Sequence, residues 1–180
     1  MSTDKIVHFV YFETVLHPEE FIGKWEHFLR SENSSVNVTL QQSKKDNLYK
    51  YIAEHRCTSE EFEFIFTKAA KTTRSKEVEI KTKHLGGYLI LQEEHGSDIK
   101  ANESKLFVFL NYSNKDFSAY KKIPFPIRLN IYEAYYENCT YAYILEYFVM
   151  DKNVEQLCDQ IQQYNAVVVD VYKECNIKTV

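Results

Sequence analysis

The same order of secondary-structure elements is predicted twice along this chain of 180 residues. Across residues 5–95, the pattern of apolar residues predicts a strand, a helix, two strands, a helix and a further strand. Residues 105–175 repeat that order with a shorter first helix. Each half is therefore expected to form a four-stranded antiparallel sheet with helices on one face.

The strongest local signals lie in the first half. Residues 6–12 are β-branched or aromatic on both faces, which is typical of a central strand that is covered on both sides. Pro18 fits the first turn of a helix, and apolar side chains follow it at helical spacing. Thr58 and Glu61 have the spacing of a capping box, which predicts a second helix from about residue 59.

Glycines and aromatic runs place the remaining strands. Gly86 and Gly87 are expected to break the strand pattern, which resumes at residues 88–92 as the last strand of the first half. In the second half, residues 127–136 and 141–150 predict two long aromatic strands joined by a short hairpin. These strands complete the predicted sheet of each half.

Composition indicates where one unit ends and the next begins. Residues 96–104 are polar and predict a linker, which leaves residues 1–95 as the first repeat and residues 105–180 as the second. The predicted fold class is α+β, with two tandem ferredoxin-like β-α-β-β-α-β repeats whose antiparallel sheets together enclose a barrel.

The charge of the chain does not favour binding to polyanions. Its 22 basic and 26 acidic residues give a formal net charge of −4, so neither nucleic acid nor an anionic membrane is expected as a partner. No apolar run reaches the roughly 20 residues that a spanning helix needs, and the first residues lack the form of a signal peptide. We therefore expect a cytoplasmic protein.

Motifs for metal ions and cofactors are not found in the sequence. The four cysteines, at positions 57, 139, 158 and 175, are far apart and form no Cys-x-x-Cys pair. No two histidines have the spacing of metal ligands, and no glycine-rich phosphate loop is present. The sequence predicts no metal centre and no cofactor.

Four short segments resemble one branch of a known superfamily. They are Phe21-x-x-x-Trp25, residues 48–53, the turn at residues 58–62, and Gly86-Gly-Tyr88. Together they are similar to the antibiotic-biosynthesis monooxygenase branch of the dimeric α+β barrel proteins, more clearly in the first half than in the second.

This resemblance implies an architecture and a kind of site. In that superfamily two ferredoxin-like sheets usually come from two subunits, whereas here one chain would supply both, as a monomeric pseudo-dimer. The resemblance also implies a small-molecule pocket inside the barrel. Members include cofactor-independent oxygenases, haem-degrading enzymes and proteins with no known reaction.

Active members of the family use a small set of Asn, Trp, and His or Tyr and Arg side chains. Trp25 lies on the apolar stripe of its helix, where a role in the core is the favoured interpretation. The first strand contains no Asn. Asn111, on the corresponding strand of the second repeat, is the candidate ligand-binding residue that remains.

His55 is the predicted catalytic histidine. It shares a face of its strand with Tyr49 and Tyr51, because side chains alternate along a strand. If that face lines the barrel interior, His55 can act as a base and the two tyrosines can bind ligand. If it does not, His55 is a structural residue.

Charged residues on apolar faces give the candidates of the second half. Glu133 shares its face with Tyr135 and several aliphatic residues, and Glu146 likewise lies among apolar residues. A carboxyl group in such a place needs a partner, and Arg128 is the nearest candidate. We expect Glu133, Glu146 and Arg128 to be catalytic or orienting groups and Tyr135 to bind ligand. Exposure of both glutamates at a sheet edge is the alternative.

Two classes of function remain open from the sequence. One is an oxygenase-like or other cofactor-independent protein that acts on an aromatic small molecule. The other is a non-enzymatic binding or assembly module whose barrel is filled by its own Tyr and Phe side chains, of which the chain has 14 and 12. The sequence leaves open whether the chain is an enzyme.

Overall fold

The computed structural model describes most of the chain. The described residues are 5–31, 37–44, 50–63, 79–94, 99–111, 116–137, 139–163 and 168–175. The predictions made for Tyr49 and for the rest of the second helix, after residue 63, lie outside these residues.

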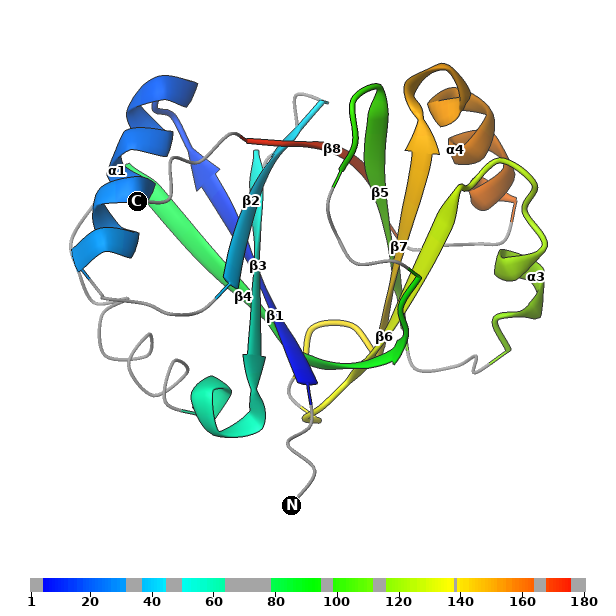
Figure 1. The fold of residues 1–180 in the computed structure, drawn as a ribbon, viewed down its shortest axis with the longest axis horizontal. Helices are drawn as coiled ribbons and strands as arrows, with labels where there is room; N and C mark the ends of the chain where they lie inside the picture. Colours follow the sequence, from blue (N-terminus) through cyan, green and yellow to red (C-terminus); the bar gives the residue numbers. More distant parts are fainter. Residues whose placement is uncertain are drawn as a thin grey trace.

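Eight strands of the described residues form one antiparallel sheet that closes into a barrel (Figure 1). Around the barrel their order is β1-β3-β2-β8-β5-β7-β6-β4, and β4 pairs with β1. The strands are β1 (Lys5–Thr14), β2 (Asn37–Ser43), β3 (Tyr51–Thr58), β4 (Ile80–Gln92), β5 (Glu103–Leu110), β6 (Arg128–Ala134), β7 (Tyr143–Met150) and β8 (Val168–Glu174).

The two halves of the barrel have the same internal strand order. The first half runs β4-β1-β3-β2 and the second runs β8-β5-β7-β6, so the first and third strands of each half are central. Two seams join the halves: β2 pairs with β8 over residues 41–43, and β4 pairs with β6 over residues 88–92. Each of the eight strands therefore has two neighbours.

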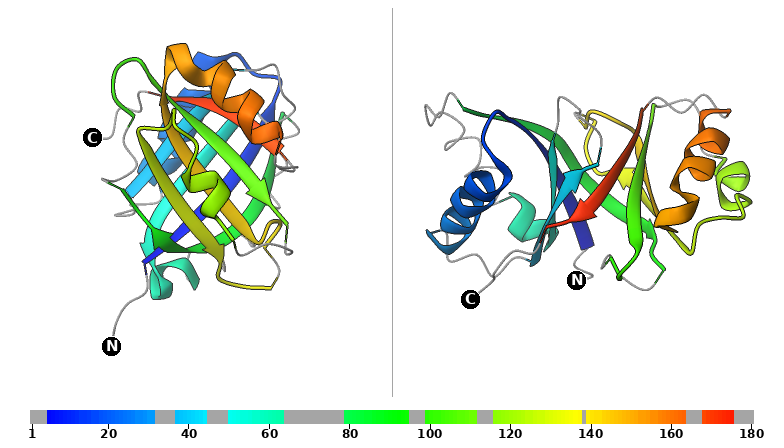
Figure 2. Two further views of the ribbon diagram at one scale, coloured as in Figure 1. Left: turned by 90° about the vertical axis from the view of Figure 1, so that its right-hand side faces the viewer. Right: turned by 90° about the horizontal axis from the view of Figure 1, so that it is seen from above.

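Helices cover the outside of the barrel on opposite sides, as Figures 1 and 2 show. They are α1 (Pro18–Ser31) on the first half, and α3 (Ser118–Lys121), the 3-10 turn η1 (Asp151–Asn153) and α4 (Val154–Gln162) on the second. After β3 a helix begins at residue 59, and its capping box is confirmed. The Glu61 amide donates to Thr58 Oγ1 at 3.2 Å, and the Thr58 amide donates to Glu61 Oε2 at 2.8 Å. No helix among the described residues combines the length and apolar character needed to cross a membrane.

Apolar side chains of the sheet pack both outward and inward. Outside the first half, Phe21 of α1 stacks on Tyr51 of β3 with ring centroids 4.2 Å apart. Phe21 is 1% exposed, and burying a side chain of this size contributes about 1.5–3 kcal/mol. Inside the barrel, a separate cluster draws apolar side chains from both halves, which explains why residues 6–12 are apolar on both faces.

β4 does not stop at its glycines, so the predicted interruption at residues 86–87 is wrong. The strand continues through them, and its pairing with β1 shifts between Phe9 and Val10, as at a β-bulge. Gly86 has a φ of +125°, and a Cβ on it would collide with the Cys139 side chain. A Cβ on Gly87 would lie 2.6 Å from Cζ of Phe62. The glycines therefore let β4 bend and let neighbouring side chains approach its backbone.

We expect Gly86→Ala to lower the free energy of unfolding by about 1–3 kcal/mol, because the new Cβ meets Cys139 and the positive φ is strained for alanine. Gly23→Ala is the matched control. In α1 a Cβ on Gly23 meets nothing within 4 Å, so alanine should stabilise the helix by about 0.5–1 kcal/mol. Guanidinium unfolding of both variants tests the pair, and an unchanged midpoint for Gly86→Ala would contradict the role of the bulge.

Candidate functional site

Aromatic side chains fill one part of the barrel interior. Phe9 of β1 lies 5.9 Å from Phe107 of β5 and 5.3 Å from Tyr132 of β6, measured between ring centroids. Tyr11 of β1 lies 5.6 Å from Phe109 of β5. These contacts join strands of opposite halves, so the rings meet directly across the barrel.

Polar side chains occupy the other part of the interior, toward the end where β3, β4 and β7 finish and β5 and β6 begin. We call these residues the Lys105 cluster; they are Gln41, Glu54, Lys105, Asn130, Tyr132 and Glu146, all at most 1% exposed. Alternation along the strands directs them inward, because the same faces carry interior apolar residues such as Ile52, Phe107 and Ile144.

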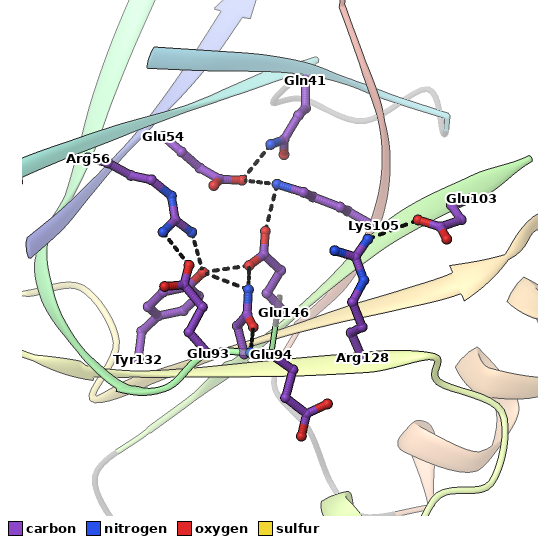
Figure 3. Close-up of polar contacts among 11 residues, drawn as sticks. Gln41, Glu54, Arg56, Glu93, Glu94, Glu103, Lys105, Arg128, Tyr132 and Glu146 are labelled. Carbon is purple, nitrogen blue, oxygen red and sulfur yellow. Dashed lines mark hydrogen bonds and ion pairs between the residues drawn. The ribbon is translucent and has the colours of Figure 1, made fainter. Parts of the chain in front are cut away.

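Lys105 is the centre of the cluster (Figure 3). Its Nζ lies 2.7 Å from Glu54 Oε1 and 2.7 Å from Glu146 Oε1, so one ammonium group bridges two carboxyl groups. The Gln41 side-chain amide also donates to Glu54 Oε1. Nζ lies 5.3 Å from the centroid of the Phe148 ring, which adds a cation–π contact.

The second oxygen of Glu146 is held by neutral groups. Tyr132 Oη donates to Glu146 Oε2 at 2.5 Å, and Asn130 Nδ2 donates to the same oxygen at 2.7 Å. Asn130 Oδ1 in turn accepts a hydrogen bond from the backbone amide of Glu94 at 2.9 Å. Glu146 is therefore fixed as a carboxylate by three side chains.

Two ion pairs lie beside the cluster. Arg56 of β3 donates to Tyr132 Oη at 3.2 Å and pairs with Glu93, which directly follows β4. Arg128 pairs with Glu103 at 2.9 Å, and its guanidinium carbon lies 3.9 Å from the centroid of the Phe148 ring.

The two carboxyl groups of the cluster differ in their pKa values. Burial raises the pKa of Glu54 to about 7, helped by the negative charge of Glu146 and opposed by Lys105. Burial would also raise the pKa of Glu146, but the charge and hydrogen bond of Lys105, with those of Tyr132 and Asn130, lower it overall. One ammonium group compensates one carboxylate, so Glu54 is the group that carries an exchangeable proton near neutral pH.

Hydrogen bonding agrees with this assignment. Among the described residues, Glu54 Oε2 and Gln41 Oε1 have no hydrogen-bond partner although both side chains are buried, whereas Glu146 Oε1, which also makes no hydrogen bond of ordinary geometry, lies 2.7 Å from Lys105 Nζ. A buried acceptor without a donor is costly, and a proton on Glu54 supplies the cluster with one more donor.

The structure brings together two of the sequence-predicted site residues. Glu146 and Arg128 both point into the barrel. Glu146 pairs with Lys105, whose ammonium group lies over the Phe148 ring, and the Arg128 guanidinium packs on the same ring. Glu133 lies on the opposite face of β6, half-buried, and its Oε1 accepts a hydrogen bond from Tyr143 at 3.0 Å. The structure therefore separates Glu133 from Glu146.

The remaining predicted residues lie away from the Lys105 cluster. His55 and Tyr51 do share a face, but it is the outer one beneath α1, where the His55 ring lies 6.0 Å from Trp25. Tyr135 packs outside the barrel, 4.4 Å from Tyr136, and Asn111 is exposed directly after β5. Among the described residues, no group of three or more His, Cys, Asp or Glu side chains is placed to hold a metal ion.

Glu54 and Lys105 were not predicted as site residues. The available signal for Lys105 was a cation at the start of an apolar strand, on the same face as Phe107 and Phe109. For Glu54 the signal was a carboxyl group on the same face of its strand as Ile52 and Arg56, which is the face opposite His55.

Comparison with known proteins identifies similar folds. No protein-family model and no curated protein matches the chain. A mutant chlorite dismutase from Candidatus Nitrospira defluvii in complex with cyanide matches with a TM-score of 0.63 and 9% identity, over 98% of this chain and 93% of that chain. An anthrone oxidase-like protein matches with a TM-score of 0.57 and 10% identity, over 97% of this chain and 93% of that chain.

At sequence identities this low, the structural matches show a likeness of fold alone. Chlorite dismutases belong to the dimeric α+β barrel superfamily, so the superfamily that the sequence resembles has the fold that the structure shows. The mixed α+β class is confirmed.

The raised pKa of Glu54 predicts a characteristic dependence of stability on pH. A carboxyl group whose pKa rises on folding stabilises the protein fully below its unfolded value of 4.5, and this contribution is lost as pH rises through about 7. Glu54→Gln does not titrate, so its stability relative to the unsubstituted protein should rise between pH 5 and pH 8, on the order of 2–3 kcal/mol. Thermal unfolding at both pH values measures the difference.

The matched control for this comparison is Glu155→Gln, at an exposed position of α4. Its difference from the unsubstituted protein should change little over the same pH range. A Glu54→Gln difference that is equally flat would contradict the assignment of the proton to Glu54.

Proposed function

We propose that this chain binds an aromatic small molecule with a hydroxyl group at the polar end of the barrel and removes a proton from it with Glu54. The observation that carries the proposal is a fully buried carboxyl group whose pKa is raised to about 7 beside a fixed ammonium group. A general base is most effective when its pKa lies near the working pH.

The cluster offers distinct roles to its members. Glu54 Oε2, which has no hydrogen-bond partner among the described residues, is the oxygen that would accept the ligand hydroxyl. Lys105, held by Glu54 and Glu146, would stabilise the anion that proton removal leaves on the ligand. Tyr132 and Asn130 keep Glu146 in place and thereby orient Lys105.

Aromatic residues beside the cluster support an aromatic ligand. In the sheet register Phe9 lies opposite Glu54, and Phe107 lies opposite Glu146. Removing a proton from a hydroxyl group on an electron-rich ring gives an anion that can react with dioxygen without a bound cofactor. The anthrone oxidase-like neighbour adds a reason to include oxygenase-like chemistry of the antibiotic-biosynthesis monooxygenase type in the proposal.

The proposal includes a pseudo-dimer made by one chain. The matching strand order of the two halves supports tandem ferredoxin-like repeats, and closure of the sheet within one chain supports a monomer. A cytoplasmic location is part of the proposal. The boundaries at residues 96–104 stay a prediction.

A second candidate function is a non-enzymatic module with a filled barrel. The ring contacts of Phe9 with Phe107 and of Tyr11 with Phe109 favour it, because they occupy the interior with the protein's own side chains. In that case the Lys105 cluster would hold the halves together and act on no ligand.

Oxygen uptake with anthrone, and with a simple quinol as second probe, tests the first candidate. Proton transfer by a positioned base contributes about 10²–10⁴-fold to a rate, so Glu54→Gln should lose at least 100-fold in turnover. Glu155→Gln, exposed on α4, should keep the rate within about twofold.

Two outcomes contradict the assignment of Glu54. If His55→Ala abolishes turnover and Glu54→Gln does not, the base is His55, the histidine that the sequence predicted, and it acts from the α1 face. If neither probe is turned over and neither raises the unfolding temperature at millimolar concentration, the filled-barrel module is the better description.

A further inference from the structure

The two ion pairs beside the Lys105 cluster differ in their access to solvent. The side chains of Arg128 and Glu103 are 7% and 6% exposed, whereas those of Arg56 and Glu93 are 20% and 27% exposed. The Arg56–Glu93 pair therefore lies between bulk solvent and the buried groups.

Two successive hydrogen bonds connect Arg56 to the buried carboxylate of the cluster. The Arg56 guanidinium donates to Tyr132 Oη, and Tyr132 donates to Glu146, whose other oxygen pairs with Lys105. Figure 3 shows Arg56, Glu93 and Tyr132 together on one side of the cluster. Moving the Arg56 side chain away from Tyr132 would uncover the cluster at this point.

The opposite end of the barrel offers a less direct route. There Phe109 packs against Tyr141 with centroids 4.8 Å apart and against Tyr11 at 5.6 Å. Phe9 and Phe107 lie between those rings and the cluster and are themselves fully buried. A molecule entering from that end would have to displace several aromatic side chains.

We propose that the Arg56–Glu93 ion pair is the gate of the Lys105 cluster, which opens by breaking while the barrel stays folded. A partly exposed pair contributes little to stability and is weakened by salt, so it can break often. The bridge from Lys105 to its two carboxyl groups is fully buried, so a reagent reaches Nζ only while the gate is open, and it reacts with the fraction of Lys105 that has lost its proton.

Backbone contacts confine the opening to side chains. The residue after Glu93 is anchored, because the Glu94 amide donates to Asn130 and Glu94 Oε2 accepts from the Leu129 amide at 3.2 Å. Glu93 can therefore leave Arg56 by rotating its side chain, and the cluster is uncovered when Arg56 then also leaves Tyr132 Oη. The gate extends the proposed function by naming its entrance, but it makes no assumption about the ligand.

Labelling of Lys105 by acetic anhydride, followed by mass spectrometry, tests the gate. Glu93→Gln should raise the labelling rate of Lys105 by about 1.4- to fivefold, the factor that corresponds to losing a partly exposed ion pair. Glu13→Gln is the control, since it removes an exposed pair with Lys81, at 3.5 Å, and should leave the Lys105 rate unchanged. Adding 0.5 M NaCl should accelerate labelling of the unsubstituted protein more than that of Glu93→Gln.

Buried thiols in the same sample separate local opening from unfolding. Cys158 and Cys175 are each 9% exposed and belong to apolar clusters on the outer side of the sheet, the opposite face from Lys105. If Lys105 is labelled in parallel with these thiols, it reacts only through global unfolding and the gate is overturned. An unchanged Lys105 rate in Glu93→Gln overturns it as well. Because no ligand is used, either result is independent of the turnover experiment.

Discussion

One ammonium group, Lys105 Nζ, joins the two halves of the barrel from inside. Glu54 comes from β3 of the first half, whereas Lys105 and Glu146 come from β5 and β7 of the second. Burying these charges is favourable only if each is paired and hydrogen-bonded, and removing one partner of such a pair costs about 3–5 kcal/mol. The protonation of Glu54 follows directly from this arrangement, because a single ammonium group compensates a single carboxylate. The most constrained group of the fold is thus also the one with proton chemistry near neutral pH.

Closure of the sheet is what places these groups against each other. The seams between β2 and β8 and between β4 and β6 bring strands together that are far apart in the chain. Lys44, just after β2, adds a polar link by donating to Ser104 at 2.5 Å and pairing with Asp151 at 2.8 Å. A barrel closed in this way excludes water from its interior, and exclusion of water both strengthens the pairing of Lys105 and shifts the pKa of Glu54.

Local signals in the sequence predicted the elements, and long-range pairing decided the site. The capping box at Thr58, the strand at residues 6–12 and the position of Glu146 on an apolar face of its strand could be read from spacing and alternation. Alternation also grouped His55 correctly with Tyr51, but it cannot tell which face of a strand points into a barrel, and that face lies under α1. The pairing of Glu54 with Lys105 spans 51 residues and depends on the closure of the sheet into a barrel, so no local pattern contains it. The glycines at 86 and 87 were interpreted as a break because their effect, a bulge against Cys139 and Phe62, also depends on distant contacts.

The most direct measurement is the titration of the Glu54 carboxyl carbon by carbon-13 NMR, with the resonance assigned by its loss in Glu54→Gln. We expect a midpoint near 7, together with a Glu146 resonance that still reports a carboxylate below pH 4.5. A Glu54 midpoint close to its ordinary value of 4.5 would show that the cluster holds both carboxyl groups ionised, and would contradict the proton-transfer role.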